Sequence, residues 1–338
     1  MDALKRVPIK IPIYILFILS LSFIVTSCSN KTDSGNLDVN SEIINLESGS
    51  VLLDNNGKYK VLNLKDNKYQ GIESDKVIIN FNKESGTYVF TKDGKHYISY
   101  KEKEIDIKDS NYNFIKISYD GKYVSYMSYD NGYNLKVISL EDDKEITIQS
   151  KVAISGNLYD FINNDKLVYY GISDDGTNGV FTYDLKNNKE ELLYKLNGGG
   201  YVDFLKGDLN NVFILQQKAN NEKELLEINA GDKSISNISN LFKSINDLVK
   251  KDGEYYILGE PLNDTKSLYK LKDKTINKLV FSFPASINME KGIEISKDSI
   301  LFIGSNSTEE KEEVFSYKDN SVSLISNKEG KYNFININ

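Results

Sequence analysis

From residue 43 onward, apolar and polar residues alternate in short runs separated by turn residues such as Asp-Gly, Asn-Gly and Asn-Asn. Such runs, rich in Tyr, Ile, Val, Leu and Phe, predict β-strands with one buried face. The segment around Ile238, Phe242 and Ile245 also has helical spacing. It aligns with first strands elsewhere in the chain, so we predict a strand there too.

The alternation is organised into a repeat. Five segments align at the turn after their first strand: 114–128, 159–173, 202–216, 246–260 and 292–306. Their turn aspartates are 45, 43, 44 and 46 residues apart. Each unit contains material for four strands, and the last of these is predicted from "KEITIQ" (144–149) in one unit and "KLVFSF" (278–283) in another. Four strands in about 40–45 residues are typical of a β-propeller blade.

Two shorter units, 48–72 and 85–107, precede these five. We therefore predict an all-β fold, a β-propeller of about seven four-stranded blades over 43–338, with six or eight blades as alternatives. The C-terminal segment "KYNFININ" (331–338) is similar to "NYNFIKIS" (111–118), the opening strand of a blade. It is predicted to complete the first blade and close the ring, which leaves no large sheet edge exposed.

The segment "SYDGKYVSYMSYDNGYNLKVISLEDDK" (118–144) resembles the blades of TolB-type and related WD40-like propellers. An Asp-Gly turn leads to an apolar strand, a loop and an aliphatic strand that ends near an acidic turn. The Trp-Asp signature of WD40 repeats is absent because the chain has no Trp. The resemblance implies a propeller that binds proteins, peptides or sugars, and it implies no reaction.

The N-terminus carries a different pattern. Lys5, Arg6 and Lys10 precede an apolar run from Ile11 to Val25, which is too short to span a bilayer and is typical of a signal peptide. Val25-Thr26-Ser27-Cys28 resembles the lipobox of bacterial lipoproteins. The resemblance implies cleavage after residue 27 and acylation of Cys28, with palmitate as the expected chain. We expect a lipid-anchored protein on the extracytoplasmic face of the cell membrane, with residues 28–42 as a flexible tether. An uncleaved anchor and plain secretion are the alternatives.

Composition narrows the function further. The chain has one Cys and one His, so it cannot form an internal disulfide or a Cys/His zinc site. Its net charge of −7 disfavours binding to nucleic acid. We expect a monomer and assign no catalytic residue.

Three aspartates are candidates for ligand or cation binding. Asp160, Asp203 and Asp247 precede the turn by the same distance in three successive units. They are predicted to share one circle on the innermost strands, where neighbouring carboxylates could hold a cation in the central channel. The alternative is that each accepts backbone hydrogen bonds within its own blade. The turn aspartates Asp120, Asp165, Asp208, Asp252 and Asp298 are predicted to be structural.

Long polar loops between the second and third strands of the last five blades are predicted to emerge on one face. Loops on a rigid scaffold are common binding sites. The leading functional hypothesis is therefore a membrane-anchored propeller that binds a protein, peptide or glycan. The alternative is an extracellular carbohydrate-active enzyme that uses the inner-strand carboxylates.

Overall fold

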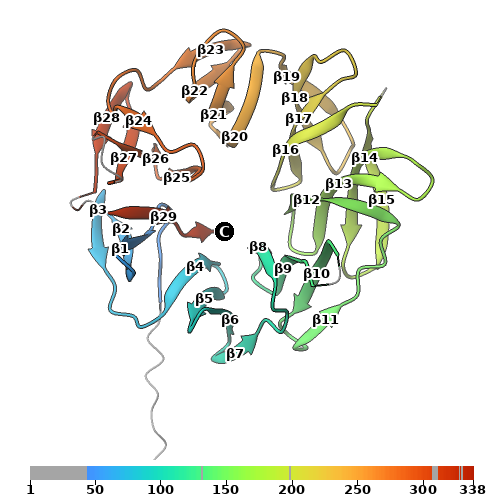
Figure 1. Ribbon diagram of the computed structural model, residues 1–338, viewed down its shortest axis with the longest axis horizontal. Coiled ribbons are helices and arrows are strands. Elements are labelled where there is room, and N and C mark those ends of the chain that lie inside the picture. The colour runs from blue at the N-terminus through green and yellow to red at the C-terminus, as the bar shows by residue number, and fades with distance from the viewer. Residues whose placement is uncertain (1–43, 131, 198, 307–310, 327, 329) are drawn as a thin grey trace, which may run out of the picture. The chain divides into compact units, whose positions relative to one another are not determined.

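The computed structural model describes residues 44–338 except 131, 198, 307–310, 327 and 329. This part of the chain is a seven-bladed β-propeller with four-stranded blades, as predicted from the repeat (Figure 1). Its regular elements are all strands. None of the described residues belongs to a helix long and apolar enough to cross a membrane.

The first three blades contain the short units and the first long one. From the ring axis outward, blade 1 contains β29 (Lys331–Phe334), β1 (Val51–Asn55), β2 (Lys58–Lys65) and β3 (Lys68–Gly71). Blade 2 contains β4 (Val77–Phe81), β5 (Tyr88–Lys92), β6 (Lys95–Tyr100) and β7 (Lys103–Asp106). Blade 3 contains β8 (Tyr112–Ile117), β9 (Tyr123–Ser128), β10 (Asn134–Ser139) and β11 (Lys144–Ile146).

The remaining blades follow the same antiparallel order. Blade 4 contains β12 (Val152–Phe161), β13 (Lys166–Ser173), β14 (Asn178–Asp184) and β15 (Lys189–Lys195). Blade 5 contains β16 (Tyr201–Asp208), β17 (Asn211–Gln217), β18 (Lys223–Asn229) and β19 (Ile235–Ser239). Blade 6 contains β20 (Phe242–Lys251), β21 (Glu254–Pro261), β22 (Ser267–Lys272) and β23 (Thr275–Lys278). Blade 7 has a divided inner strand, β24 (Ser286–Ile287) and β25 (Ile293–Ser296), followed by β26 (Ser299–Ser305), β27 (Glu313–Lys318) and β28 (Ser321–Leu324).

The C-terminal segment closes the ring as predicted. Strand β29 pairs with β1 in an antiparallel register and so supplies the inner strand of blade 1. The chain then continues into β30 (Asn336–Ile337), which pairs in parallel with β4 of blade 2 and was not predicted. The Asn338 side chain reaches further and donates to the carbonyl of Ile117 in blade 3, at 2.6 Å. The last eight residues therefore connect three blades.

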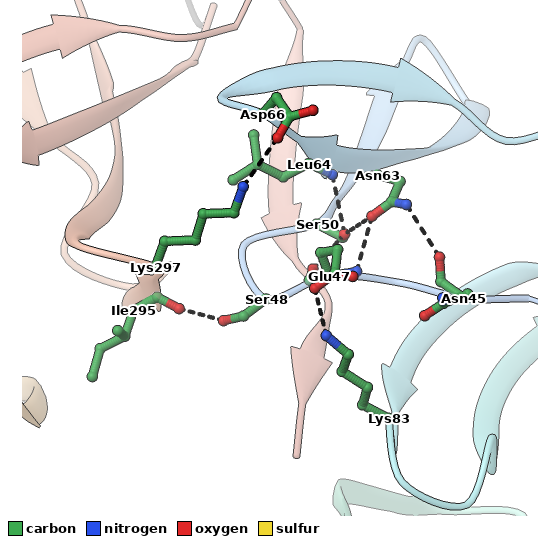
Figure 2. Close-up of polar contacts among 10 residues, drawn as sticks. All are labelled: Asn45, Glu47, Ser48, Ser50, Asn63, Leu64, Asp66, Lys83, Ile295 and Lys297. Atoms are coloured by element: carbon green, nitrogen blue, oxygen red, sulfur yellow. Dashed lines mark hydrogen bonds and ion pairs between the residues drawn. The ribbon is translucent and has the colours of Figure 1, made fainter.

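The start of the described chain reinforces this closure (Figure 2). Segment 44–50 crosses the junction before β1, where the Asn63 side chain bonds Asn45 and Glu47. Ser48 donates to the carbonyl of Ile295 in blade 7. Ion pairs join Lys83 to Glu47, at 2.5 Å, and Lys297 to Asp66, at 3.1 Å. Polar contacts thus tie blades 7, 1 and 2 together where the chain enters the ring.

The core lies between the blades. Seven apolar clusters are buried, and each joins residues of two neighbouring blades. In the absence of Trp, tyrosines fill much of this space. Their hydroxyls find partners, as when Tyr126 donates to Asp109 at 2.6 Å. Each blade is therefore stabilised mainly by apolar packing against its two neighbours.

Candidate functional site

Two of the three predicted aspartates, Asp160 and Asp247, make the same set of contacts on the innermost strands. Oδ1 of Asp160 accepts from the next backbone N–H, of Phe161, at 2.9 Å, and Oδ2 accepts from Gly207 N–H of blade 5 at 3.1 Å. Lys116 of blade 3 completes the set at 2.9 Å. Each carboxylate of this kind connects three successive blades.

Asp247 repeats the pattern two blades further along the ring. It accepts from Leu248 N–H at 2.8 Å and from Ile293 N–H of blade 7 at 2.9 Å. Lys206 of blade 5 is its ion-pair partner, at 2.7 Å. Because these contacts cross blade boundaries, the predicted alternative of hydrogen bonds within one blade accounts for only part of them.

Asp203 does not share this environment, which corrects the predicted circle of three carboxylates. Val202 pairs with Gln216 and Phe204 with Leu215, so Asp203 is the extra residue of a β-bulge in β16. A bulge interrupts the alternation of side chains, and an alignment by spacing cannot detect it. Asp203 is exposed and pairs with Lys223 of its own blade.

Sequence reasoning also missed other charged side chains of the described inner strands, among them Lys206 and Glu294. Burial lowers the pKa of Lys206, but the Asp247 carboxylate outweighs burial and the pKa is raised to about 12. Burial raises the pKa of Glu294 to about 8, with Lys206 opposing the rise and Asp247 adding to it. Along the inner strands of blades 3 to 6, Lys116, Asp160, Lys206 and Asp247 alternate in charge, so each of these two carboxylates is neutralised by a lysine of another blade.

These contacts bear on the cation and enzyme interpretations. Asp160, Asp203 and Asp247 each have a lysine partner. The described residues include no group of three or more His, Cys, Asp or Glu side chains that could hold a metal ion. The geometry therefore gives no support to a cation held by these aspartates. It also gives no support to two of them acting together as the acid and base of a glycoside hydrolase. Cys28 lies outside the described residues.

The two ends of the propeller differ in their connections. One end, which we call the loop end, carries the connections between second and third strands and those from blade to blade. The opposite end, the turn end, carries the tight turns between first and second and between third and fourth strands. Most of the described non-glycine residues with positive φ lie at the turn end, such as Asp66, Asn188 and Asp252. Asp, Asn and Gly suit that backbone conformation.

The loop end carries most of the exposed large apolar side chains. At blades 6 and 7 we define an apolar patch by four residues: Leu241, Leu262, Phe281 and Phe283. Leu241 and Leu262 line a pocket of about 190 Å³ with Pro261, Tyr269 and Ile276. Phe281 is 80% exposed. At the turn end, Leu209 is an exposed residue of comparable size, at 63%.

Two residues of the patch, Phe281 and Phe283, belong to a segment whose structure was predicted wrongly. "KLVFSF" (278–283) was predicted to be the last strand of its blade, but β23 ends at Lys278. Pro284 cannot donate to a sheet ladder, which opposes a strand through this segment. The segment connects blades 6 and 7 instead, with the Phe283 ring 5.4 Å from that of Phe315. The Phe-Ser-Phe-Pro sequence (281–284) was the feature that could have predicted the end of the strand before it.

Comparisons with known proteins identify the fold. No protein-family model matches the sequence, and no curated protein sequence matches it. Puromycin hydrolase is similar in structure, with a TM-score of 0.55 and 7% identity over 86% of this chain and 54% of that chain. Acylaminoacyl peptidase from Pyrococcus horikoshii has a TM-score of 0.55 and 12% identity over 82% and 50%. TolB from Acinetobacter baumannii has a TM-score of 0.44 and 9% identity over 76% and 64%.

These likenesses concern the fold alone, because the identities are so low. This chain spans about half the length of the two hydrolases. Their names therefore carry no activity to this chain, and the TolB likeness is too weak to support an argument. What the comparisons establish is a β-propeller of a kind found in proteins with several functions.

Proposed function

We propose that this protein is a membrane-anchored, extracytoplasmic lipoprotein whose propeller binds a partner protein through the apolar patch of the loop end, without catalysis. The observation that carries this proposal is that four exposed Leu and Phe side chains belong to the loop end of blades 6 and 7. Exposed apolar surface on one face of a protein is a common mark of a protein interaction site. Burial of each would contribute roughly 25 cal/mol per Å² of area removed from water.

The patch is held by an ordered loop. Lys278 Nζ lies 3.0 Å from Asp264 and donates to Thr265 Oγ1 at 2.8 Å. The Tyr269 hydroxyl donates to the Thr265 carbonyl at 2.5 Å. Leu262 N–H donates to the Leu241 carbonyl at 2.8 Å, which connects the loop to the segment that enters β20, the inner strand of the same blade. A surface fixed in this way loses little conformational entropy on binding.

The lipid anchor is proposed from the sequence. The structure describes where the chain that follows residue 43 enters the propeller. Segment 44–50 contacts Lys83 and Ile295, which lie at the turn end. The described chain therefore enters the propeller at the turn end, whereas the apolar patch belongs to the loop end.

Site-specific crosslinking in the native cell tests the binding surface. A photoreactive phenylalanine analogue at position 262 should crosslink to one protein of defined mass, and the same analogue at position 209 should not. Leu209 is a matched control because it is equally apolar and similarly exposed, at 63% against 56%. Adding Leu241→Asp should abolish the product at 262. Equal crosslinking at both positions would refute the proposal.

Acylation is tested separately. Cys28→Ser should remove incorporation of labelled palmitate and release the protein from the membrane fraction, because stable anchoring requires acyl chains. Retention of the variant in membranes without label would instead indicate an uncleaved segment. Release of the unmodified protein would indicate plain secretion.

A further inference from the structure

A second cavity at the loop end lies between blades 4 and 5, apart from the apolar patch. Its volume is about 430 Å³. This is within the range of about 300–1,000 Å³ that is usual for small-molecule sites. The wall comes from the end of β15 and the segment after it, and from the facing ends of β17 and β18 with the loop between them. Its polar residues are Tyr194, Asn197, Gln216, Gln217, Lys218, Asn220 and Glu224.

One chain of hydrogen bonds fixes the wall. The Tyr194 hydroxyl donates to Gln216 Oε1 at 3.0 Å, across the boundary between the blades. Gln216 Nε2 donates to Glu224 Oε2 at 2.8 Å. Lys218 Nζ donates to Glu224 Oε1 at 2.5 Å. Both carboxylate oxygens of Glu224 are engaged, and the lysine charge offsets that of the carboxylate. The cavity is therefore polar without a net charge on its wall.

The amides of the wall retain hydrogen-bonding capacity. A carboxamide has two N–H donors and an oxygen with two lone pairs. Gln217 uses one donor on Asn221, at 3.0 Å, and one lone pair on the Tyr201 hydroxyl, at 2.9 Å. Gln216 likewise uses one of each kind. Each amide can still donate one hydrogen bond and accept another.

This chemistry selects among ligands. A hydroxyl group donates and accepts at once, so adjacent hydroxyls match an amide that offers both functions side by side. An anion would need a cation that is not already paired, and the Lys218 ammonium is held by Glu224. The ring of Tyr194 in the cavity wall adds apolar area for the C–H face of a sugar.

We propose that the cavity between blades 4 and 5 binds a hexose unit of an uncharged glycan. The site is distinct from the apolar patch and adds to the proposed protein docking. Its contacts come from two blades, so the ring geometry itself builds the site.

Saturation-transfer NMR on the full chain tests this, in a detergent without a sugar headgroup. The probes are maltotetraose, cellotetraose, mannotetraose and chitotetraose, with a hexuronate tetramer and tetra-alanine as comparisons. At least one uncharged oligosaccharide should bind with millimolar or better affinity and in preference to both comparisons. Gln217→Ala should weaken binding about tenfold. Asn263→Ala, in the pocket of the apolar patch, should leave it unchanged.

Each outcome decides the proposal. Absence of binding by all four oligosaccharides, unchanged binding by Gln217→Ala, or preference for the hexuronate or the peptide would overturn it. If Gln217→Ala lowers the thermal unfolding midpoint, Asn220→Ala replaces it, since Asn220 is exposed on the loop. Crosslinking at position 262 should persist in both variants. The sugar site and the protein surface can therefore fail independently.

Discussion

The turn end and the loop end of this propeller are made from the same repeat, yet they are constructed for different purposes. At the turn end, tight turns contact the neighbouring blade directly. Asn82 Nδ2 of blade 2 donates to the carbonyls of Ser118 and Tyr119 in blade 3, at 3.0 and 2.8 Å. Asn210 N–H of blade 5 donates to the Ile162 carbonyl of blade 4 at 2.7 Å. These contacts lock the ring.

The loop end uses its connections differently. It carries the apolar patch and both described cavities. If the proposed function holds, the main binding surfaces lie at the loop end and the turns that join neighbouring blades lie at the turn end. Four sets of substitutions test this difference between the ends.

The largest effect is expected from a matched pair of glycines. Gly121, at the turn end, has φ +67, and a Cβ there would lie 1.9 Å from Ser85 Oγ and 2.8 Å from Ser85 Cβ. Gly176, at the loop end, has φ +82 and open space around it. Gly121→Ala should lower the free energy of unfolding by about 3 kcal/mol, from overpacking and backbone strain together. Gly176→Ala should cost about 1 kcal/mol, from strain alone. Chemical denaturation measures both, and equal costs would contradict the division between the ends.

The next largest loss of stability is expected from the aspartates of the inner strands. Asp247→Ala removes a carboxylate that accepts two backbone N–H groups and pairs with Lys206. We expect a loss of about 2 kcal/mol, because a largely buried ammonium and two N–H groups lose their partner. Asp203→Ala removes an exposed pair and should cost less than about 1 kcal/mol. Denaturation midpoints of the two variants would separate them, and equal losses would restore the predicted equivalence of the aspartates.

The dependence of stability on pH gives a third test. Because burial raises the folded-state pKa of Glu294 from 4.5 to about 8, the folded protein retains a proton that the unfolded chain loses. Stability from this group is present below about pH 4.5 and is lost as pH rises to about 8. The loss should be on the order of 2 kcal/mol, less than the full shift implies because Glu294 is only half-buried. Glu294→Gln should flatten this part of the profile, as measured by thermal unfolding from pH 5 to 9.

The architecture could be predicted from the sequence because it depends on period and alternation. The 43–46 residue spacing predicted the blades. The similarity of 331–338 to an opening strand predicted that the C-terminal segment closes blade 1. The strand over Phe242–Lys251 was predicted correctly because the repeat outweighed its helical spacing. Hydrophobic patterning is a collective signal, and single exceptions do not erase it.

The candidate sites could not be predicted in the same way. The bulge at Asp203 shifts one residue and changes the direction of its side chain. The pairing of Lys206 with Asp247 depends on two residues from different blades, 41 positions apart. The cavity between blades 4 and 5 likewise requires Tyr194 and Gln216 to meet across a boundary. Such features depend on the relative placement of blades, which spacing within a blade does not determine.

The smallest effect on stability is expected from the apolar patch itself, and it sharpens the comparison most directly. Leu262→Asp at the loop end and Leu209→Asp at the turn end each place a charge on an exposed position, so neither buries an unpaired carboxylate. Each should change the free energy of unfolding by less than about 0.5 kcal/mol. The two variants should nevertheless differ in the cell. The partner identified by crosslinking from position 262 should co-purify with Leu209→Asp and should not co-purify with Leu262→Asp. A large loss of stability in Leu262→Asp would mean that this side chain supports the fold, and the loop end would then share the structural role assigned here to the turn end.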